Sequence, residues 1–264
     1  MTQDQDAARP SVSAGVYDTN YFLMDCEGYE DFRSGKVSQR LLTGLGMVAV
    51  QPGQHVLDIA CGRGEAAIWL AERGAWAWGL DYALPALHIA QGQASQRSSV
   101  ERVRFIAANV RALPFGDGLF DHAVMMDVVE HLYPWELHHA LCEAYRVLRP
   151  RGQLLVHTAP NRWYYRWGYP AFRFTERVRG RKLPIDPRQR FRYHSLMHVN
   201  EQSPWSLRQA MRRAGFRVCV SVDASRTEWD RMGKVSRLVG NTAIRLPLIK
   251  WVICGDIFAV GRKD

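Results

Sequence analysis

The chain has 264 residues, which is enough for one sizeable open α/β domain. An apolar share of 47% excludes wholesale disorder, and five scattered cysteines without a Cys-x-x-Cys pair exclude a disulfide framework and a thiolate zinc site. The formal net charge is +9, and the segment from Asn161 to His198 holds ten basic residues against two acidic ones, so the excess is a local patch that suggests an anionic partner.

The N-terminal residues 1–15 are polar, have no signal-peptide pattern and are expected to be disordered. No apolar run reaches the roughly 20 residues that a membrane span needs. The nearest candidate, 243–260, contains Arg245, Pro247, Lys250 and Asp256. We therefore expect a soluble cytoplasmic protein, and contact with a membrane surface stays open.

From residue 50 onward, apolar strand patterns alternate with helix patterns, which predicts a mostly parallel α/β sheet covered on both faces. Strands are expected at 54–60, 76–80, 103–107, 120–126, 153–158, 216–222 and 257–260. Helices are expected at 65–73, 84–96, 135–148 and 206–214. Residues 16–264 are expected to form a single domain, with a helical cap (16–49), a core (50–160), an insertion (161–198) and a C-terminal part of the sheet (199–264).

A glycine-rich turn follows the first expected strand, in the sequence from Val56 to Gly64. Gly62 and Gly64 would let the backbone approach a ligand closely at the carboxyl end of the strand. Asp81 ends the second strand, where a carboxylate can accept hydrogen bonds from both ribose hydroxyls of a nucleoside. NAD enzymes share this arrangement, and a tight turn with an exposed acid is the purely structural alternative.

Five stretches in chain order resemble the motifs of class I S-adenosylmethionine (SAM)-dependent methyltransferases. They are the glycine-rich turn 58–64, the segment 107–115 with its Leu-Pro-Phe, the strand 120–124, the helix-to-strand turn 145–154 and the Ala-Gly-Phe at 214–216. The resemblance implies a Rossmann-like, doubly wound, mostly parallel seven-stranded sheet with an N-terminal helical cap and an acceptor-side insertion. It also implies SAM as the cofactor.

The resemblance assigns roles to residues around the cofactor. Asp58 and the turn from Ala60 through Gly62 to Gly64 would hold the methionine end, and Asp81 the ribose. The remaining expected contacts are Tyr82 and Val110 beside the adenine, Asn109 at its amino group and Met126 near the sulfonium. Two positions depart from the family: Ala60 replaces a glycine, which is tolerable if its φ is negative, and Asn109 replaces an aspartate.

Candidate catalytic residues follow the fourth strand. Asp127, Glu130 and His131 are spaced i, i+3, i+4 and would share one face if this segment is helical. The spacing resembles the Glu-x-x-Glu-His element of ubiquinone-pathway O-methyltransferases and small-RNA 3′-end methyltransferases, which implies a divalent metal with His198 or His194 as a further ligand. His131 as a general base is the metal-free version. Alternatively, Glu130 and His131 only cap and orient the helix.

The insertion interleaves its basic residues with nine aromatic ones. Arginine pairs with phosphate and aromatic faces suit sugar rings, so the insertion is expected to act as an acceptor-side lid. Its candidate substrate contacts are Trp163, Tyr164, Arg166, Arg190 and His198. The layout is loosely similar to methyltransferases of glycan clusters, and solvated arginines over packed aromatics are the alternative.

The sequence therefore predicts a SAM-dependent methyltransferase that acts on the oxygen of a sugar or of a phosphorylated, lipid-linked glycan. Alternative acceptors are a natural product or quinone-type phenol and, less favoured, RNA. A non-enzymatic alternative is a SAM-binding partner or regulatory subunit. The acceptor atom and the oligomeric state do not follow from the sequence.

Overall fold

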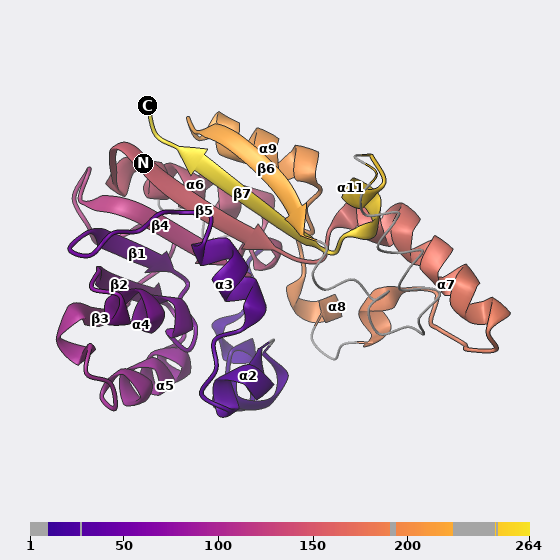
Figure 1. Cartoon of the computed structure of the whole chain (residues 1–264), viewed down its shortest axis with the longest axis horizontal. Helices are drawn as coiled ribbons and strands as arrows, with labels where there is room; N and C mark the ends of the chain where they lie inside the picture. Colours follow the sequence, from indigo (N-terminus) through magenta and orange to yellow (C-terminus); the bar gives the residue numbers. More distant parts are fainter. Residues whose placement is uncertain (1–9, 27, 191–193, 224–245, 247) are drawn as a thin grey trace.

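The structure is a computed structural model of the chain, and it describes residues 10–26, 28–190, 194–223, 246 and 248–264. A seven-stranded sheet forms its centre, in the order β3-β2-β1-β4-β5-β7-β6. Strands β3, β2, β1, β4 and β5 are parallel neighbours, and β7 runs antiparallel to both β5 and β6. The expected α/β fold with a mostly parallel seven-stranded sheet is confirmed (Figure 1).

The central strands β1, β4, β5 and β7 are largely buried and mainly apolar, as in a sheet that is covered on both faces, whereas the edge strands β3 and β6 are more exposed. The strand bounds are β1 His55–Ile59, β2 Trp76–Asp81, β3 Val103–Ala107, β4 Phe120–Met126, β5 Leu148–Thr158, β6 Arg217–Asp223 and β7 Asp256–Arg262. The expected bounds of β3 and β4 match those observed. Strand β5 begins five residues earlier than expected, at Leu148 directly after a helix.

The helices of the core lie on the two faces of the sheet. They are α3 Gln39–Leu45, α4 Glu65–Glu72, α5 Leu84–Ala94, α6 Pro134–Val147 and α9 Pro204–Arg213. Residues of α6 and α9, such as Leu141 and Met211, pack with Met125 on one face. Residues of α3 and α4, such as Leu41 and Leu70, pack with Val124 on the other. Alternate residues of β4 thus serve two apolar layers, which is the period of a strand.

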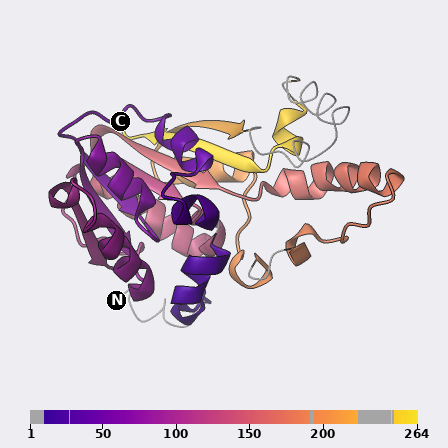
Figure 2. The same ribbon diagram turned by 60° about the horizontal axis from the view of Figure 1, so that its bottom comes forward.

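Smaller elements lie outside the sheet and the helices that cover it. Before α3 come η1 Ala14–Val16, the π-helix η2 Tyr21–Asp25 and α2 Tyr29–Arg33. The others are η3 Val100–Arg102, η4 Val129–His131, the π-helix η5 Tyr164–Gly168, α7 Tyr169–Val178, η6 Pro187–Arg190, α8 His194–Met197 and α11 Lys250–Ile253. In two views related by a rotation, α7 extends away from the sheet (Figures 1 and 2).

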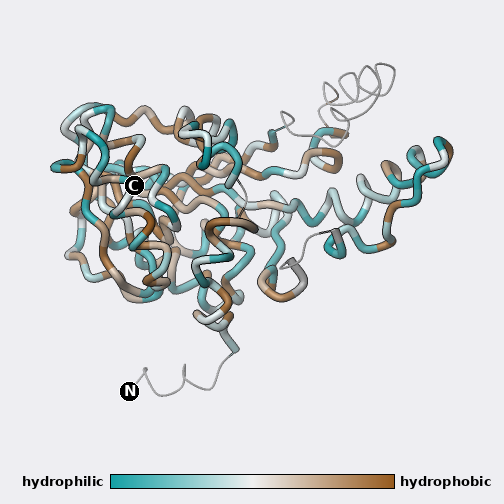
Figure 3. Tube along the Cα trace, turned by 90° about the horizontal axis from the view of Figure 1, so that it is seen from below, coloured by the Kyte–Doolittle hydropathy of each residue, from teal (hydrophilic) through white to brown (hydrophobic). Residues whose placement is uncertain are grey.

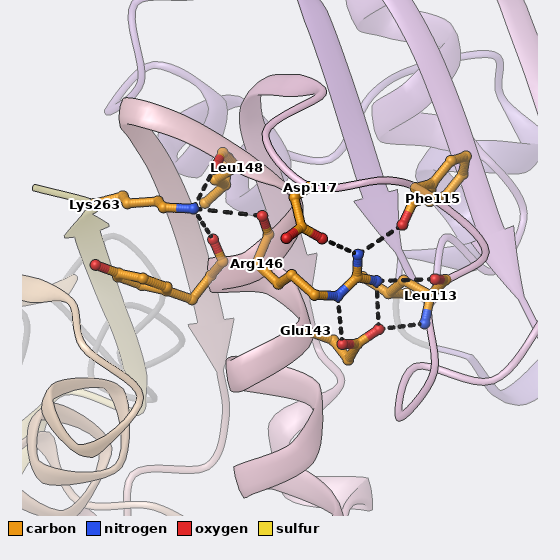
Figure 4. Close-up of polar contacts among 8 residues, drawn as sticks. Leu113, Phe115, Asp117, Glu143, Arg146, Leu148 and Lys263 are labelled. Carbon is orange, nitrogen blue, oxygen red and sulfur yellow. Dashed lines mark hydrogen bonds and ion pairs between the residues drawn. The ribbon is translucent and has the colours of Figure 1, made fainter.

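Arg146 at the end of α6 fixes the loop that follows β3 (Figure 4). Its Nη1 donates to the carbonyl of Phe115 at 2.7 Å and its Nη2 to the carbonyl of Leu113 at 3.1 Å. Glu143 completes the contact by accepting from the backbone N–H of Leu113 at 2.8 Å. The Lys263 ammonium donates to the last carbonyls of α6, at 2.8 Å from that of Tyr145. Two of the sequence motifs therefore form one rigid support beside the cofactor end of the sheet.

None of the helices in the described part of the chain has the length and apolar character that crossing a bilayer requires.

Candidate functional site

A cavity of about 970 Å³ opens at the carboxyl ends of β1, β2, β4 and β5. Eight of the nine expected cofactor contacts line it, and Gly64 is the exception. They are Asp58, Ala60, Gly62, Asp81, Tyr82, Asn109, Val110 and Met126. Ligands of open α/β sheets bind at this edge, so the motif residues converge where a nucleoside cofactor is expected.

The glycine-rich turn has a left-handed backbone at three positions. Ala60, Gly62 and Gly64 have φ of 58°, 51° and 77°. The condition under which alanine would be tolerable at position 60, a negative φ, is not met, because the turn needs the conformation that glycine adopts freely and alanine adopts at a cost. At Gly64, an added Cβ would lie 2.7 Å from the ring of Phe105, so close packing as well as φ requires glycine there.

Two carboxylates hold the backbone around this turn. Asp81 accepts from the N–H of Gly62 through Oδ2 and from the N–H of Ala83 through Oδ1, each at 2.9 Å. Asp58 accepts from the N–H of Ala67 at 3.2 Å, and burial raises its pKa to about 7. Burial also raises the pKa of Asp81, against the effect of its backbone hydrogen bonds. Asp81 therefore organises the turn and faces the cavity.

The expected adenine contacts Tyr82, Asn109 and Val110 all line the cavity. The Asn109 side-chain oxygen, expected to accept from an adenine amino group, accepts from the backbone N–H and the Nε of Arg111, both at 3.0 Å. The Tyr17 ring packs edge-on against Tyr82, with centroids 5.6 Å apart. Val110 is buried in the core cluster below.

The expected helix face of Asp127, Glu130 and His131 is wrong. Asp127 has φ of 57° directly after β4, and only the short 3-10 turn Val129–His131 follows. The three side chains consequently divide between two groups. Sequence spacing alone could not show this, because the conformation of Asp127 accompanies contacts with distant parts of the chain.

Asp127 belongs to a buried network of alternating charges. Its carboxylate lies 2.6 Å from Nη2 of Arg40 and 2.5 Å from Nδ1 of His157. The other nitrogen of His157, Nε2, lies 3.1 Å from Asp256. Burial disfavours the charged form of each group, but the partners outweigh it: the pKa of Asp127 is held below its usual range and that of His157 is raised to about 9.

Glu130 and His131 meet His198 in the second group. One ligand atom from each of these three residues lies within 4.8 Å of the others, and the two imidazole centroids are 5.0 Å apart. The carbonyl of Glu130 accepts from the backbone N–H of Val199 at 2.9 Å, which brings His198 to the turn. Thr158 Oγ1 donates to Glu130 Oε2 at 2.7 Å, while burial and the charge of Asp127 raise the Glu130 pKa. Two imidazoles and a carboxylate can act as a base with its orienting groups or as metal ligands.

The insertion contributes only part of the expected acceptor contacts. Tyr164 and His198 line the cavity, together with Tyr165, which was not expected. Trp163 and Arg166 are not among the described lining residues. The side chains of Arg190 and His194 and the whole of residues 191–193 lie outside the described part of the chain.

The N-terminal segment covers the cavity, which the sequence did not indicate. Tyr17, Tyr21 and Phe22 line it, and the Trp135 Nε1 donates to the carbonyl of Pro10 at 3.1 Å. Arg63 donates to the carbonyl of Phe22 at 3.0 Å. The aromatic residues of 17–22 were the available signal, but their helical pattern predicts only a cap.

Residues 56–152 match the methyltransferase domain family. The chain contains a class I SAM-dependent methyltransferase domain. The chain is 42% identical over 105 residues to a demethylmenaquinone methyltransferase of Thermus thermophilus, covering 39% of this chain and 46% of the relative. It is 31% identical over 166 residues to a probable S-adenosylmethionine-dependent methyltransferase of Mycolicibacterium smegmatis, covering 63% and 53%. The chain thus spans about half the length of the curated relatives it matches.

Solved structures share the fold of this methyltransferase domain and its surroundings over nearly the whole chain. The geranyl diphosphate C-methyltransferase of Streptomyces coelicolor, in complex with Mg²⁺, geranyl diphosphate and S-adenosyl-L-homocysteine, matches with a TM-score of 0.62 at 14% identity, covering 91% of this chain and 86% of that one. The [4+2]-cyclase SpnF matches with a TM-score of 0.63 at 18% identity, covering 96% and 98%. At these identities the likeness concerns the fold alone.

Proposed function

We propose that this chain binds SAM in the cavity and transfers its methyl group to a hydroxyl oxygen of a sugar or of a phosphorylated, lipid-linked glycan. One observation carries the proposal: the same cavity is lined by the cofactor motifs and by Glu130, His131 and His198. Methyl transfer from SAM is an in-line displacement, so a site that aligns the acceptor with the methyl carbon supplies most of what the reaction needs.

SAM would bind with its ribose at Asp81, its adenine between Tyr82 and Val110, and its methionine end at Asp58 and the Ala60–Gly64 turn. In this position Met126 lies toward the sulfonium. Tyr17 and Tyr21 would then cover the bound cofactor, since both line the cavity from the N-terminal side. Exclusion of water by such a cover keeps SAM from hydrolysis.

His131 is the proposed general base for the acceptor hydroxyl. The nucleophile forms the new C–O bond as the S–CH₃ bond breaks, S-adenosylhomocysteine (SAH) leaves, and the hydroxyl proton passes to the imidazole. Glu130 and His198 would orient that imidazole. Asp127, which also lines the cavity, would hold Arg40 and His157 in place.

A metal-assisted version is supported by the donor set of the same three residues, whose ligand atoms lie within 4.8 Å of one another. Glu130, His131 and His198 would hold a divalent cation, which lowers the pKa of a bound hydroxyl. Asp127 is not part of this version, because its carboxylate is engaged by Arg40 and His157.

The acceptor class rests on Tyr164 and Tyr165, which offer aromatic faces to the cavity beside polar groups. A quinone-type phenol is the second candidate, supported by the relatives named as demethylmenaquinone methyltransferases. An O-methyltransferase of Penicillium expansum, 30% identical over 122 residues, supports oxygen as the methylated atom, and a natural-product acceptor is a further alternative. RNA and a non-enzymatic SAM-binding role are the remaining alternatives. We also propose a cytoplasmic location, which the five free cysteines support.

The test incubates the chain with methyl-labelled SAM and four probes: a free hexose, a nucleotide-activated hexose, a polyprenyl-diphosphate-linked hexose and a polyprenyl phenol. We expect label in a hexose probe, and loss of that label in His131→Gln. His138→Gln is the matched control, since His138 is exposed on α6 away from the cavity. Label only in the phenol would contradict the sugar assignment. Label in no probe, with SAH binding intact, would favour the non-enzymatic role.

A further inference from the structure

The π-helix η5 and α7 form a continuous helical arm that projects from the body of the protein. In all three ribbon and tube views it extends away from the sheet (Figures 1, 2 and 3). We call residues 164–186 the arm. It has its own small apolar cluster, in which Tyr164, Tyr169 and Phe172 are buried with Leu183 packed against them.

One face of the helix in the arm is held by residues 183–186, which we call the returning segment. The Tyr169 hydroxyl donates to the carbonyl of Pro184 at 2.9 Å, and Arg173 Nε donates to the carbonyl of Leu183 at 3.1 Å. Glu176 is buried and pairs with Arg179 and Arg181. These contacts order the arm internally, so its outer face is presented by a preformed helix.

The opposite face of the helix is an apolar stripe that no described residue covers. Trp167, Phe174 and Val178 are 54%, 67% and 74% exposed, and Ala171 between them is exposed too. With about 100° per residue, the α7 positions 171, 174 and 178 fall within roughly 60° of one another and roughly opposite the buried positions 169, 172 and 176. The returning segment adds Ile185, which is 81% exposed. So large a set of exposed apolar side chains on one element marks an interaction surface.

Positive charge flanks this stripe. The segment from Arg166 to Lys182, with both ends included, has six basic residues and one acidic residue. The single acid, Glu176, is already shared by Arg179 and Arg181, whereas Arg166, Arg177 and Lys182 are exposed. On the helix, positions 166, 173 and 177 form a row directly beside the stripe.

We propose that the arm docks on an anionic lipid surface, with Trp167, Phe174 and Val178 in the interface and the neighbouring cations among the headgroups. A helix with one apolar stripe and a cationic border lies in the plane of such an interface. RNA would take up the cations but leave the stripe in water, and a solvated arm would explain neither feature. The arm also begins at the cavity, because Tyr164 and Tyr165 line it and Trp167 follows two residues later. Docking would therefore bring the cavity mouth to the membrane surface.

The test is flotation of the full chain with phosphatidylcholine vesicles, with and without phosphatidylserine. We expect binding only with phosphatidylserine, and weakening as salt rises. Phe174→Ser and Val178→Ser should each lower the partition coefficient roughly tenfold, the effect of withdrawing one large apolar side chain from an apolar phase. Arg177→Gln and Lys182→Gln should each lower it about fivefold.

Helix α9 supplies matched controls, since it also has ten residues, with an exposed Trp205 and exposed basic residues. Trp205→Ser, Arg208→Gln and Arg212→Gln should leave vesicle binding unchanged. SAH affinity, measured without vesicles, should be the same in all arm variants and so reports that they fold.

Three results would overturn the proposal. They are no binding to phosphatidylserine vesicles, an equal loss in the α9 variants, and arm-dependent binding of a single-stranded RNA oligonucleotide without vesicle binding. None of these results bears on SAM binding or methyl transfer, so the proposed function stands or fails separately.

Discussion

The Asp127 carboxylate and the His157 imidazole are joined across the sheet, with 2.5 Å between Oδ1 and Nδ1. Asp127 directly follows β4, and His157 lies in β5 with no exposed surface. Because Arg40 and Asp256 pair with the outer ends of this couple, two positive and two negative charges alternate at the wall of the cavity, which Arg40, Asp127 and Asp256 line. A buried array of this kind is favourable only while every member is present.

We predict that His157→Gln lowers the free energy of unfolding by about 3–5 kcal/mol, because it removes the cation that lies between Asp127 and Asp256 and leaves only Arg40 to pair with Asp127. Urea unfolding near neutral pH measures this. A loss below about 1 kcal/mol would mean that the network does not stabilise the fold.

His157 should also make the free energy of unfolding depend on pH. The His157 pKa is raised to about 9 in the folded chain, so its stabilising effect is complete below the unfolded value of about 6.5 and is lost as pH rises through about 9. The unfolding free energy should therefore fall by on the order of 2 kcal/mol across that window, and His157→Gln should remove this slope. His122→Gln is the control, since the His122 pKa is lowered and lies below the window. A wild-type slope retained in His157→Gln would contradict the assignment.

We predict that replacement of Ala60 by glycine raises the free energy of unfolding. Its φ of 58° is one that alanine occupies at a cost and glycine does not. Ala60→Gly should raise the unfolding free energy by roughly 0.5–1 kcal/mol, after allowing for the extra flexibility of glycine in the unfolded chain. Ala71→Gly in α4 should instead destabilise by about 1 kcal/mol. Denaturation of both variants checks this, and destabilisation by Ala60→Gly would show that the left-handed conformation is wrong.

The strands followed from the sequence because each is a short apolar run bounded by turn residues. Val103–Ala107 and Phe120–Met126 needed no information from elsewhere in the chain. The left-handed backbone conformation of Asp127 could not be predicted in this way. Its backbone conformation accompanies contacts with Arg40 and His157, which come from other elements.

The cofactor side of the site was likewise local and the acceptor side was not. Asp58 and Asp81 lie near the carboxyl ends of β1 and β2, and Gly62 lies in the turn after β1, so their positions follow from the alternation of strands and helices. Tyr17, Tyr21 and Arg40 line the cavity only because the N-terminal segment folds back over the sheet. No spacing in the sequence encodes that docking.

The group of Glu130, His131 and His198 can act as a base site or as a metal site, and the two roles predict different effects on the rate of methyl transfer to the probe that is methylated. As a base site, the enzyme should be indifferent to a chelator while His131→Gln loses about 10²–10⁴-fold in kcat. As a metal site, a chelator should abolish activity and Mg²⁺, Mn²⁺ or Zn²⁺ should restore it. We expect the first outcome. Full activity both with chelator and in His131→Gln would leave this group with a structural role only.

We propose that the cavity at the ends of β1 and β2 is a SAM site organised by Asp81. Each Asp81 oxygen accepts a hydrogen bond from a backbone N–H group. In Asp81→Asn, the side-chain NH₂ group faces one of these two N–H groups and cannot accept from it. The substitution therefore weakens the turn as well as any ribose contact. The most direct measurement is calorimetric titration of the full chain with SAH. We expect one site per chain, and a ten- to hundredfold weaker affinity in Asp81→Asn, equivalent to about 1.5–3 kcal/mol. Asp121→Asn is the control, since Asp121 also accepts a backbone N–H, from His55 at 2.8 Å, but does not line the cavity. No heat with SAH, heat with NADH instead, or an unchanged affinity in Asp81→Asn would contradict the account.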